Sequence, residues 1–414
     1  MICVMRKRLV LGLAASLTMI LGGVGCNDEP LPKLEGAVAI SAGGQHACAM
    51  LGDGTAACWG GNGSQELGSQ ARTMTEPRPV FVGGLSGVKL VAAGGVETCA
   101  VLEDGTASCW GDNFWGQLGR GTSGTSPFST PAPVAGLSGV LALAVSGPGD
   151  DDPFASGQDH FACALLTSGA VDCWGLSTSD EVGTADVSQI TFSSPMPVAG
   201  VTSAAAVGLG VSGVCAVLNN GAVACWGSGF GGVLGEAGGG DSPTPVMIEG
   251  LPGPALAVTG GTYHRCALLR DGTVWCWGSD VISQGLIGAG TATAGIIVRT
   301  PVAVSNLSGV TQISAGPYHT CAVRADGTVW CWGENDRGQV GGPPPHPALV
   351  PTQVVGVTGA TAISSGQSFA CALLGTGEVQ CWGDDTAGEL GDGATEAAPP
   401  AAPVFVVAPA GNSY

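Results

Sequence analysis

The strongest constraint on the fold is a cysteine pair that occurs seven times. The two cysteines of each pair are ten positions apart, and Trp-Gly always follows the second. The first cysteines of successive pairs are 50 to 64 residues apart. A repeat of this length indicates one supersecondary unit per period, so we expect an array of similar units. The pairs are Cys48 with Cys58, Cys99 with Cys109, Cys163 with Cys173, Cys215 with Cys225, Cys266 with Cys276, Cys321 with Cys331 and Cys371 with Cys381.

The residues between the cysteines predict a β-hairpin. Each pair encloses a central triplet that ends in glycine, as in Gly52–Gly54. A three-residue hairpin loop usually ends in a left-handed residue, which glycine adopts without a Cβ penalty. Counting outward places Cys48 opposite Cys58, at the Cα separation of about 4.5 to 5.5 Å of directly opposed strands, which a disulfide can bridge. The spacing therefore predicts seven cross-strand disulfides.

Zinc ligation and free buried thiols are the alternatives to disulfides. Zinc sites usually have about two to four residues between paired cysteines, with histidine or further cysteines nearby. Here nine residues intervene, and histidine precedes only some of the pairs, as at His46, His264 and His319. The spacing favours disulfides.

The N-terminus has the form of a bacterial export signal. Arg6, Lys7 and Arg8 precede the apolar stretch Leu9–Leu21, which is too short to span a bilayer comfortably. We expect residues 1–25 to be removed, Cys26 to carry lipid, and residues 26–36 to form a short tether. The protein is then anchored in the cell envelope, at the periplasmic or outer face. Ordinary cleavage and secretion is the alternative, and disulfides persist in either compartment.

The charge of the chain excludes several kinds of partner. Without residues 1–25 the formal charge is −22. Nucleic-acid binding requires a basic surface, so we expect no nucleic acid and no membrane contact except through a lipid anchor. Acidity of this size favours a protein partner with a basic surface.

Each repeat is expected to contain four short strands. In the fifth repeat these are Ala255–Thr259, His264–Leu269, Thr273–Gly278 and Thr300–Val304. Radially arranged four-stranded sheets make a β-propeller. We therefore predict an all-β, seven-bladed propeller over residues 37–407, followed by a tail of residues 408–414. Either Pro30–Leu34 or Pro403–Val407 could complete the last blade.

The repeat resembles the regulator of chromosome condensation repeat family. Its best copies are Ser314–Val323 (SAGPYHTCAV), Asp326–Gly333 (DGTVWCWG) and Gly111–Gly119 (GDNFWGQLG). The resemblance implies a seven-bladed propeller, and the paired cysteines resemble its secreted bacterial members. A nuclear member is a nucleotide-exchange factor, a plant member senses ultraviolet light through clustered tryptophans, and a secreted bacterial member binds its target through loops on one face. Because tryptophan recurs once per repeat here, we expect it to pack between blades.

Nothing in the sequence indicates catalysis. The chain lacks G-x-S-x-G, H-E-x-x-H and a glycine loop ending in Gly-Lys-Ser/Thr. We expect no enzyme, no catalytic residue and no cofactor. The third repeat has an insertion containing Asp150, Asp151 and Asp152, weak candidates for calcium that are otherwise simply solvated. An enzyme or small-ligand or calcium-binding protein that uses the central channel, and exchange-factor activity by family analogy, are the alternatives.

The segments after each Trp-Gly vary, so they are the places for a specific function. We predict a non-enzymatic scaffold that docks a protein partner, of unknown identity, through these loops. The predicted partner-binding residues are Asp112, Asn113, Phe114, Trp115, Phe230, Asn335, Asp336, Arg337, Asp384 and Asp385.

Overall fold

The computed structural model describes residues 31–69, 73–124, 127–146, 160–185, 188–235, 240–280, 284–290, 296–344, 346–400 and 402–409. Within these ranges the strands form seven antiparallel sheets of four, each in sequence order. The predicted signal peptide, Cys26 and the aspartates Asp150, Asp151 and Asp152 lie outside the described residues. No helix in the described part of the chain is long and apolar enough to cross a membrane.

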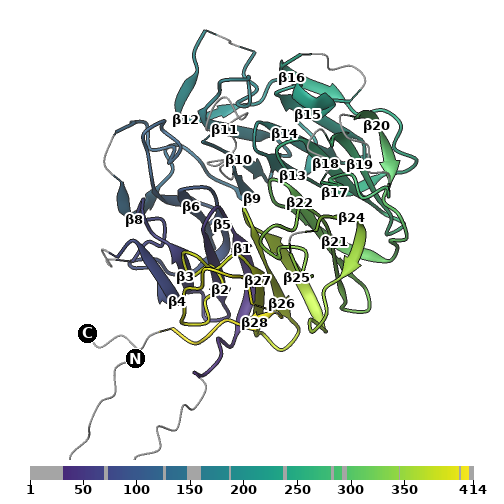
Figure 1. Ribbon diagram of the computed structural model, residues 1–414. Coiled ribbons are helices and arrows are strands. Elements are labelled where there is room, and N and C mark those ends of the chain that lie inside the picture. Colours follow the sequence, from purple (N-terminus) through teal and green to yellow (C-terminus); the bar gives the residue numbers. More distant parts are fainter. Residues whose placement is uncertain are drawn as a thin grey trace, which may run out of the picture. The chain divides into compact units, whose positions relative to one another are not determined.

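The sheets are the blades of the predicted propeller, which is confirmed. In Figure 1 the first strand of each blade lies near the centre and the fourth at the rim. Blades 1 to 4 are β1 (Ala37–Ala42), β2 (His46–Leu51), β3 (Ala56–Gly61) and β4 (Thr75–Phe81); β5 (Val88–Ala93), β6 (Glu97–Leu102), β7 (Ala107–Gly111) and β8 (Phe128–Pro133); β9 (Val140–Val145), β10 (Phe161–Leu166), β11 (Val171–Leu176) and β12 (Thr191–Pro197); β13 (Ala204–Gly210), β14 (Gly213–Leu218), β15 (Val223–Gly227) and β16 (Ser242–Met247). Blades 5 to 7 are β17 (Ala255–Gly260), β18 (His264–Leu269), β19 (Val274–Ser279) and β20 (Ile297–Ala303); β21 (Val310–Ala315), β22 (His319–Arg324), β23 (Val329–Gly333) and β24 (Ala348–Gln353); β25 (Ala360–Ser365), β26 (Phe369–Leu374), β27 (Val379–Gly383) and β28 (Val404–Phe405).

The second and third strands of every blade form the predicted hairpin. Cys48 lies opposite Cys58, and the Leu51 amide donates to the Thr55 carbonyl across the turn. Gly54 has a φ of 81°, and the last turn residue of the other six hairpins is also a glycine with positive φ. The turn chemistry that the sequence indicates is therefore present in all seven blades.

All seven predicted cysteine pairs are disulfides in the structure. Their Cα atoms are 4.0 to 4.1 Å apart, which is closer than the range of about 4.5 to 5.5 Å expected for directly opposed residues. The pairing is as predicted, and the expected separation was too long. The bridges join Cys48 to Cys58, Cys99 to Cys109, Cys163 to Cys173, Cys215 to Cys225, Cys266 to Cys276, Cys321 to Cys331 and Cys371 to Cys381.

One backbone hydrogen bond joins each blade to the next in the same way. The amide of the first residue of a blade donates to the carbonyl of the hairpin glycine in the blade before it, as Val88 does to Gly54 at 2.9 Å. Ala37 makes this bond to Gly377 and so links blade 1 to blade 7. The other five bonds run from Val140, Ala204, Ala255, Val310 and Ala360 to Gly105, Gly169, Gly221, Gly272 and Gly327.

Both ends of the chain take part in closing the ring. The fourth strand of blade 7 comes from the C-terminal segment, because β28 pairs with β27. The N-terminal segment then adds a bridge between Lys33 and Val407, and the Leu34 amide donates to the Val406 carbonyl at 2.8 Å. Leu34 is 2% exposed. The sequence left open which terminus completes the ring, and the answer is that both do.

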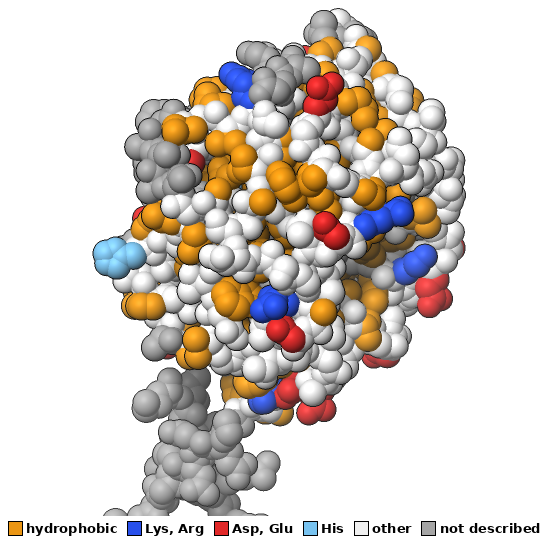
Figure 2. Space-filling view, turned by 90° about the vertical axis from the view of Figure 1, so that its right-hand side faces the viewer, with side chains coloured by type: hydrophobic (Ala, Val, Ile, Leu, Met, Phe, Trp, Pro, Cys, Tyr) orange, Lys and Arg blue, Asp and Glu red, His pale blue; other side chains and the backbone are white. Residues whose placement is uncertain are grey.

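The rim is built from the fourth strands, which are sheet edges. Each contains proline or directly follows one, as at Pro77 and Pro79 in β4, Pro301 in β20 and Pro403 before β28. Proline removes a backbone donor, which discourages pairing with another chain. The side view in Figure 2 shows apolar and polar side chains mixed, with scattered charges, on the part of the rim that faces the viewer.

Candidate protein-binding face

The order of the strands gives the propeller two different faces. Turns between first and second strands, and the long loops between third and fourth strands, lie at one end of every sheet. We call this end the loop face. The hairpin turns between second and third strands and the connections between blades lie at the other end, which we call the hairpin face.

The long loops start from the same anchor in every blade. The first residue after Trp-Gly donates its amide to a carbonyl in the turn between the first and second strands, as Asp112 does to Val96 at 3.0 Å. The same bond joins Gly61 to Gln45, Leu176 to His160, Ser228 to Ser212, Ser279 to Tyr263, Glu334 to Tyr318 and Asp384 to Ser368. The base of each loop is therefore fixed by backbone geometry, whatever its sequence.

Three of the predicted partner-binding residues are internal supports of their loops. The side chains of Asn113, Asn335 and Asp385 accept hydrogen bonds from amides five residues later, at 3.1 to 3.2 Å. They are 0%, 2% and 1% exposed. A partner cannot reach them in this fold, so they are removed from the predicted contact set. A short polar residue three positions after the tryptophan, present in every blade but the fourth, was the sequence signal for this supporting role.

The seven tryptophans of the Trp-Gly motif pack between blades, as expected. Each indole Nε1 donates to a backbone carbonyl in the long loop of the preceding blade, as Trp110 does to Glu66 at 2.8 Å. All seven are at most 2% exposed. The other bonds join Trp174 to Gln117, Trp226 to Glu181, Trp277 to Val233, Trp332 to Leu286, Trp382 to Gln339 and Trp59 to Glu389.

The tips of the loops carry the accessible candidates. Phe114 and Phe230 are 48% and 64% exposed, and both lie four positions after their tryptophan. Asp336 occupies this position in blade 6 and is exposed together with Arg337. Asp112, Trp115 and Asp384 are partly buried.

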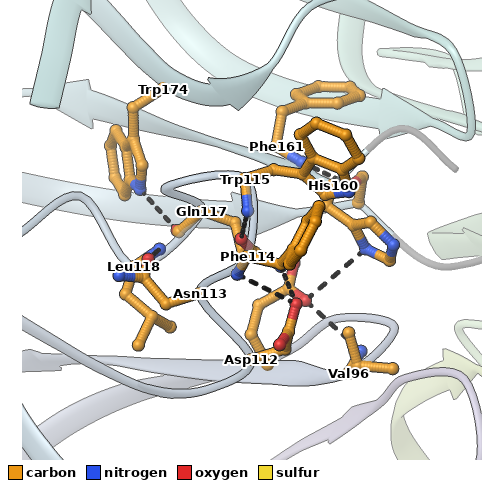
Figure 3. A network of polar contacts seen from close by, with 12 residues as sticks. Val96, Asp112, Asn113, Phe114, Trp115, Gln117, Leu118, His160, Phe161 and Trp174 are labelled. Atoms are coloured by element: carbon orange, nitrogen blue, oxygen red, sulfur yellow. Dashed lines mark hydrogen bonds and ion pairs between the residues drawn. The ribbon is translucent and has the colours of Figure 1, made fainter. Parts of the chain in front are cut away.

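Polar contacts hold the aromatic pair of blade 2 in place (Figure 3). The Asp112 carboxylate accepts from Gln117 Nε2 at 2.7 Å and from the Phe114 amide at 3.2 Å. Gln117 Oε1 in turn accepts from the Trp115 amide at 2.9 Å. The rings of Phe114 and Trp115 meet edge to face with centroids 4.6 Å apart. Asp112 thus acts mainly by shaping the loop that presents the two rings.

A buried carboxylate beside this loop breaks the repeat. Glu97 occupies the position where other blades have His46, His264 or His319, and it is fully buried. Its Oε2 lies 3.9 Å from Nδ1 of His160 in blade 3 and accepts from the Val96 amide. Figure 3 shows His160 at this junction, close to the Phe114 and Trp115 loop. The pair joins blades 2 and 3, and both side chains are buried.

The loop face is the acidic face. The seven long loops contain 15 Asp and Glu residues against three arginines and no lysine, whereas the seven segments between second and third strands contain six against one arginine. Burial is the main cause that raises the pKa of Glu66, Glu334, Asp385 and Glu389 to about 7. Repulsion from nearby aspartates adds to each shift, so these carboxyls keep a proton to higher pH than free carboxyls do.

The central channel offers little chemistry at the loop face. Its opening has a volume of about 100 Å³ and is lined largely by small residues such as Gly43, Gly44, Gly316 and Gly366. No His, Asp or Glu of the described residues lines it. The described ranges also contain no group of three or more metal-ligating side chains. The convergent acids and bases that would favour a channel enzyme are not found among these described lining residues.

Fold and faces together define a class of protein: a seven-bladed β-propeller with one disulfide per blade and a variable, acidic loop face. Residues 88–411 match the RCC1-like domain, and residues 37–66 match the regulator of chromosome condensation (RCC1) repeat. The chain belongs to the regulator of chromosome condensation repeat family.

Relatives in this family have varied roles. The chain is 27% identical over 318 residues to the ultraviolet-B receptor UVR8 of Arabidopsis thaliana, covering 76% of this chain and 69% of the receptor. It is 27% identical over 353 residues to the protein pim1 of Schizosaccharomyces pombe, covering 77% of this chain and 63% of that one. The chain thus spans about two thirds of the length of these relatives.

Solved structures agree in fold. Prp20p of Saccharomyces cerevisiae, which has binding properties toward Gsp1p and histones, is 21% identical with a TM-score of 0.70, covering 90% of this chain and 87% of Prp20p. Human WBSCR16 is 19% identical with a TM-score of 0.71, covering 82% and 87%. At these identities the likeness shows the fold alone.

Proposed function

We propose that this protein is a non-enzymatic scaffold that docks a protein partner on its loop face. Relatives with protein-binding or regulatory roles make such a function the natural starting point. The observation that carries the proposal is that different positions of the repeat have different roles, some structural and some exposed. The paired cysteines and the Trp-Gly tryptophans are buried in every blade, supporting polar side chains are buried in most blades, and the loop tips carry exposed residues that differ from blade to blade.

The size and charge of the loop face suit a protein partner. Seven loops gathered on one face offer a broad surface, and a standard interface takes roughly 800 Å² per partner. Binding hot spots favour Trp, Tyr and Arg near the centre of an interface, which points to Trp115 with Phe114 and to Arg337. The excess of carboxylates in the loops favours a basic partner surface and association that slows as salt rises.

The proposed location is the cell envelope. Seven disulfides indicate an oxidising compartment, and the predicted export signal with Cys26 is the basis for proposing a lipid anchor. The propeller begins at Pro32, where the Ala408 amide donates to the Pro32 carbonyl at the hairpin-face end of blade 7. The described chain therefore enters the propeller at the hairpin-face end of blade 7.

Anchoring is tested by fractionation. A Cys26→Ala protein is expected to leave the membrane fraction, because acyl chains contribute about 0.8 kcal/mol per buried CH₂. Membrane association equal to that of the parent would remove the lipid anchor from the proposal without touching the binding function.

Partner binding is tested by affinity capture of envelope proteins, followed by variants of the captured complex. Trp115→Ala and Arg337→Ala are each expected to weaken capture at least tenfold, with the far-ultraviolet spectrum and thermal midpoint unchanged. Arg270→Ala is the matched control, since Arg270 is an exposed arginine in a hairpin turn of the opposite face. Loss of binding in the Arg270 variant alone would place the partner on the hairpin face.

A further inference from the structure

One arginine is buried beside the central channel without a carboxylate partner. Arg265 in β18 is 2% exposed, and its Nη1 donates to the carbonyls of Gly261 at 2.6 Å and His264 at 2.9 Å. Among the described residues, Arg265 makes no ion pair, and its Nε and Nη2 have no hydrogen-bond acceptor. Burial lowers the pKa of Arg265 to about 10, so the guanidinium remains charged at neutral pH. A buried charge without a counter-ion is costly, so an anion bound here would stabilise the fold.

Three departures from the repeat make room for this side chain. The position of Arg265, one before the first cysteine, holds Ala, Thr or Val in the other six blades. The residue opposite this position in the first strand carries a side chain in those blades, but in blade 5 it is Gly260. In blade 4, Gly213 replaces the His, Glu or Phe that stands two before the first cysteine elsewhere. A Cβ would lie 2.4 Å from the Arg265 Cδ at Gly260 and 3.1 Å from Nη2 at Gly213.

The guanidinium lies in the wall of the channel opening on the loop face. A Cβ at Gly210 would lie 2.3 Å from the Arg265 Nη1 and 2.6 Å from Nη2, so the group packs directly on the Gly210 backbone. Gly210 and Gly260 both line the opening, which has a volume of about 100 Å³ and no Asp or Glu among its described lining residues. Nε and Nη2 are not among the described polar atoms that are sealed from solvent without a partner, so both retain some accessible surface. The opening therefore gives a small anion a route to the two nitrogens.

The two nitrogens without an acceptor form one side of the guanidinium fork. Their N–H bonds run parallel, which matches the two oxygens of a carboxylate. One arginine supplies one positive charge, which balances a carboxylate but not a phosphate dianion. We propose that Arg265 binds a small carboxylate at the loop-face opening of the channel, through Nε and Nη2. This inference goes beyond the scaffold function and does not depend on it.

The test is a titration of the purified, oxidised protein with sodium acetate at constant ionic strength, followed by saturation-transfer NMR of the acetate methyl group. The parent is expected to bind acetate. Arg265→Lys is expected to weaken binding about tenfold, because lysine keeps the charge but lacks the fork. Arg270→Lys is the matched control and should bind as the parent does, since Arg270 is exposed on the hairpin face.

A second variant guards against loss of folding. Gly213→His combined with Arg265→Thr recreates the buried pair of His46 and Thr98 that joins blades 1 and 2, so the far-ultraviolet spectrum should stay that of the parent while acetate binding is lost. Absence of acetate binding by the parent would overturn the proposal. Parental affinity in the double variant would overturn it too, because the anion would then bind elsewhere.

Two peptide probes identify the source of the carboxylate. A short neutral peptide is compared with the same peptide amidated at its C-terminus. Competition with acetate by the free-acid peptide alone would support a site for the end of a protein chain. Binding of acetate with no competition by either peptide would support a site for a free small acid.

Discussion

At the scale of single residues, neighbouring blades contact each other through a pair of buried residues, one from each blade. The residue two before the first cysteine of a blade faces the residue one before the first cysteine of the next. His46 meets the Thr98 hydroxyl at 2.8 Å, and His264 meets that of Thr320 at 2.7 Å. At the junction of blades 4 and 5, Gly213 leaves the room that the buried Arg265 occupies. The pairs are complementary in size, which the repeat pattern alone does not show.

Of the three junctions that begin with a histidine at this position, the one at His319 lacks the partner hydroxyl, and adding it should stabilise the protein. Neither ring nitrogen of the buried His319 has a hydrogen-bond partner among the described residues, and Ala370 stands where Thr98 and Thr320 stand in other blades. Ala370→Thr is expected to raise the free energy of unfolding by about 1 kcal/mol, measured by urea titration with tryptophan fluorescence. Ala47→Thr is the control, because its junction partner is Phe369 and added bulk should destabilise. A loss of stability in the Ala370 variant would contradict the pairing rule.

The raised pKa of Glu389 predicts a pH-dependent gain from a single substitution. Its folded pKa is about 7, mainly through burial, and an unfolded glutamate titrates near 4.5. The folded state therefore loses stability as pH rises from about 4.5 to 7. Glu389→Gln should be more stable than the parent by roughly 1 to 3 kcal/mol at pH 8 and should show no such gain at pH 4.

The residues at the Glu389 position in other blades explain why Gln should fit there, and one of them provides a control. Gln117 and Gln339 occupy the same position in blades 2 and 6, and each donates to the carboxylate five residues earlier. Blade 7 has Asp384 at that position, whereas blade 1 has Gly61. Glu66→Gln should therefore gain less than Glu389→Gln in chemical denaturation at pH 8. An equal gain for Glu389→Gln at pH 4 and pH 8 would show that ionisation is not the cause.

At the scale of the element, each blade contains a hairpin, formed by its second and third strands, that is closed by its own disulfide. Each bridge closes a loop of 11 residues, worth about 2.5 to 3 kcal/mol in the chain-entropy model. A four-stranded blade buries little by itself, so it depends on this link and on the tryptophan that reaches into the preceding blade.

All seven hairpin pairs are expected to be oxidised in the protein isolated from its natural compartment. Alkylation of denatured, unreduced protein followed by mass measurement should find almost no labelled thiol between Cys48 and Cys381. Reduction before alkylation is the control and should label all 14 cysteines of the pairs. Several labelled cysteines without reduction would refute the disulfide assignment for the natural protein.

At the scale of the whole molecule, the ring depends on a junction that is not covalently continuous. Leu34 packs in one cluster with Trp59, Leu390 and Val406, so it joins the two ends of the chain. Lys33 supports the same junction through Glu378 at 2.9 Å and through the Phe405 ring. In the other blades an unbroken connection carries the equivalent residue, such as Leu137.

Leu34→Ala is expected to loosen the closure more than the same change at Leu137. Both side chains are buried, so each substitution removes a similar apolar contact at a cost of about 2 to 5 kcal/mol. Only at Leu34 is the affected segment a chain end that can detach. Trypsin should therefore cut after Lys33 faster in the Leu34 variant, while the Leu137 variant keeps the parental rate. Equal rates would mean that closure does not depend on Leu34.

Much of the architecture could be predicted from the sequence because it is local and repeated. A spacing of ten between cysteines, a glycine-ended turn and a period near 50 residues determine hairpin, disulfide and blade count without knowledge of any distant contact. The seven Trp-Gly tryptophans likewise indicate a contact made once per blade. These features depend on short stretches of chain, where turn chemistry and strand pairing leave few choices.

The candidate site was decided by tertiary structure. Asn113, Asn335 and Asp385 look in sequence like exposed polar loop residues, yet each is buried under its own loop because the amides five residues later need an acceptor. The rings of Phe230, Tyr263 and Tyr318 likewise become neighbours only when blades 4, 5 and 6 pack side by side. Ring closure required both termini to meet. Contacts between blades follow from the curvature of the whole ring, and a single repeat does not encode that curvature.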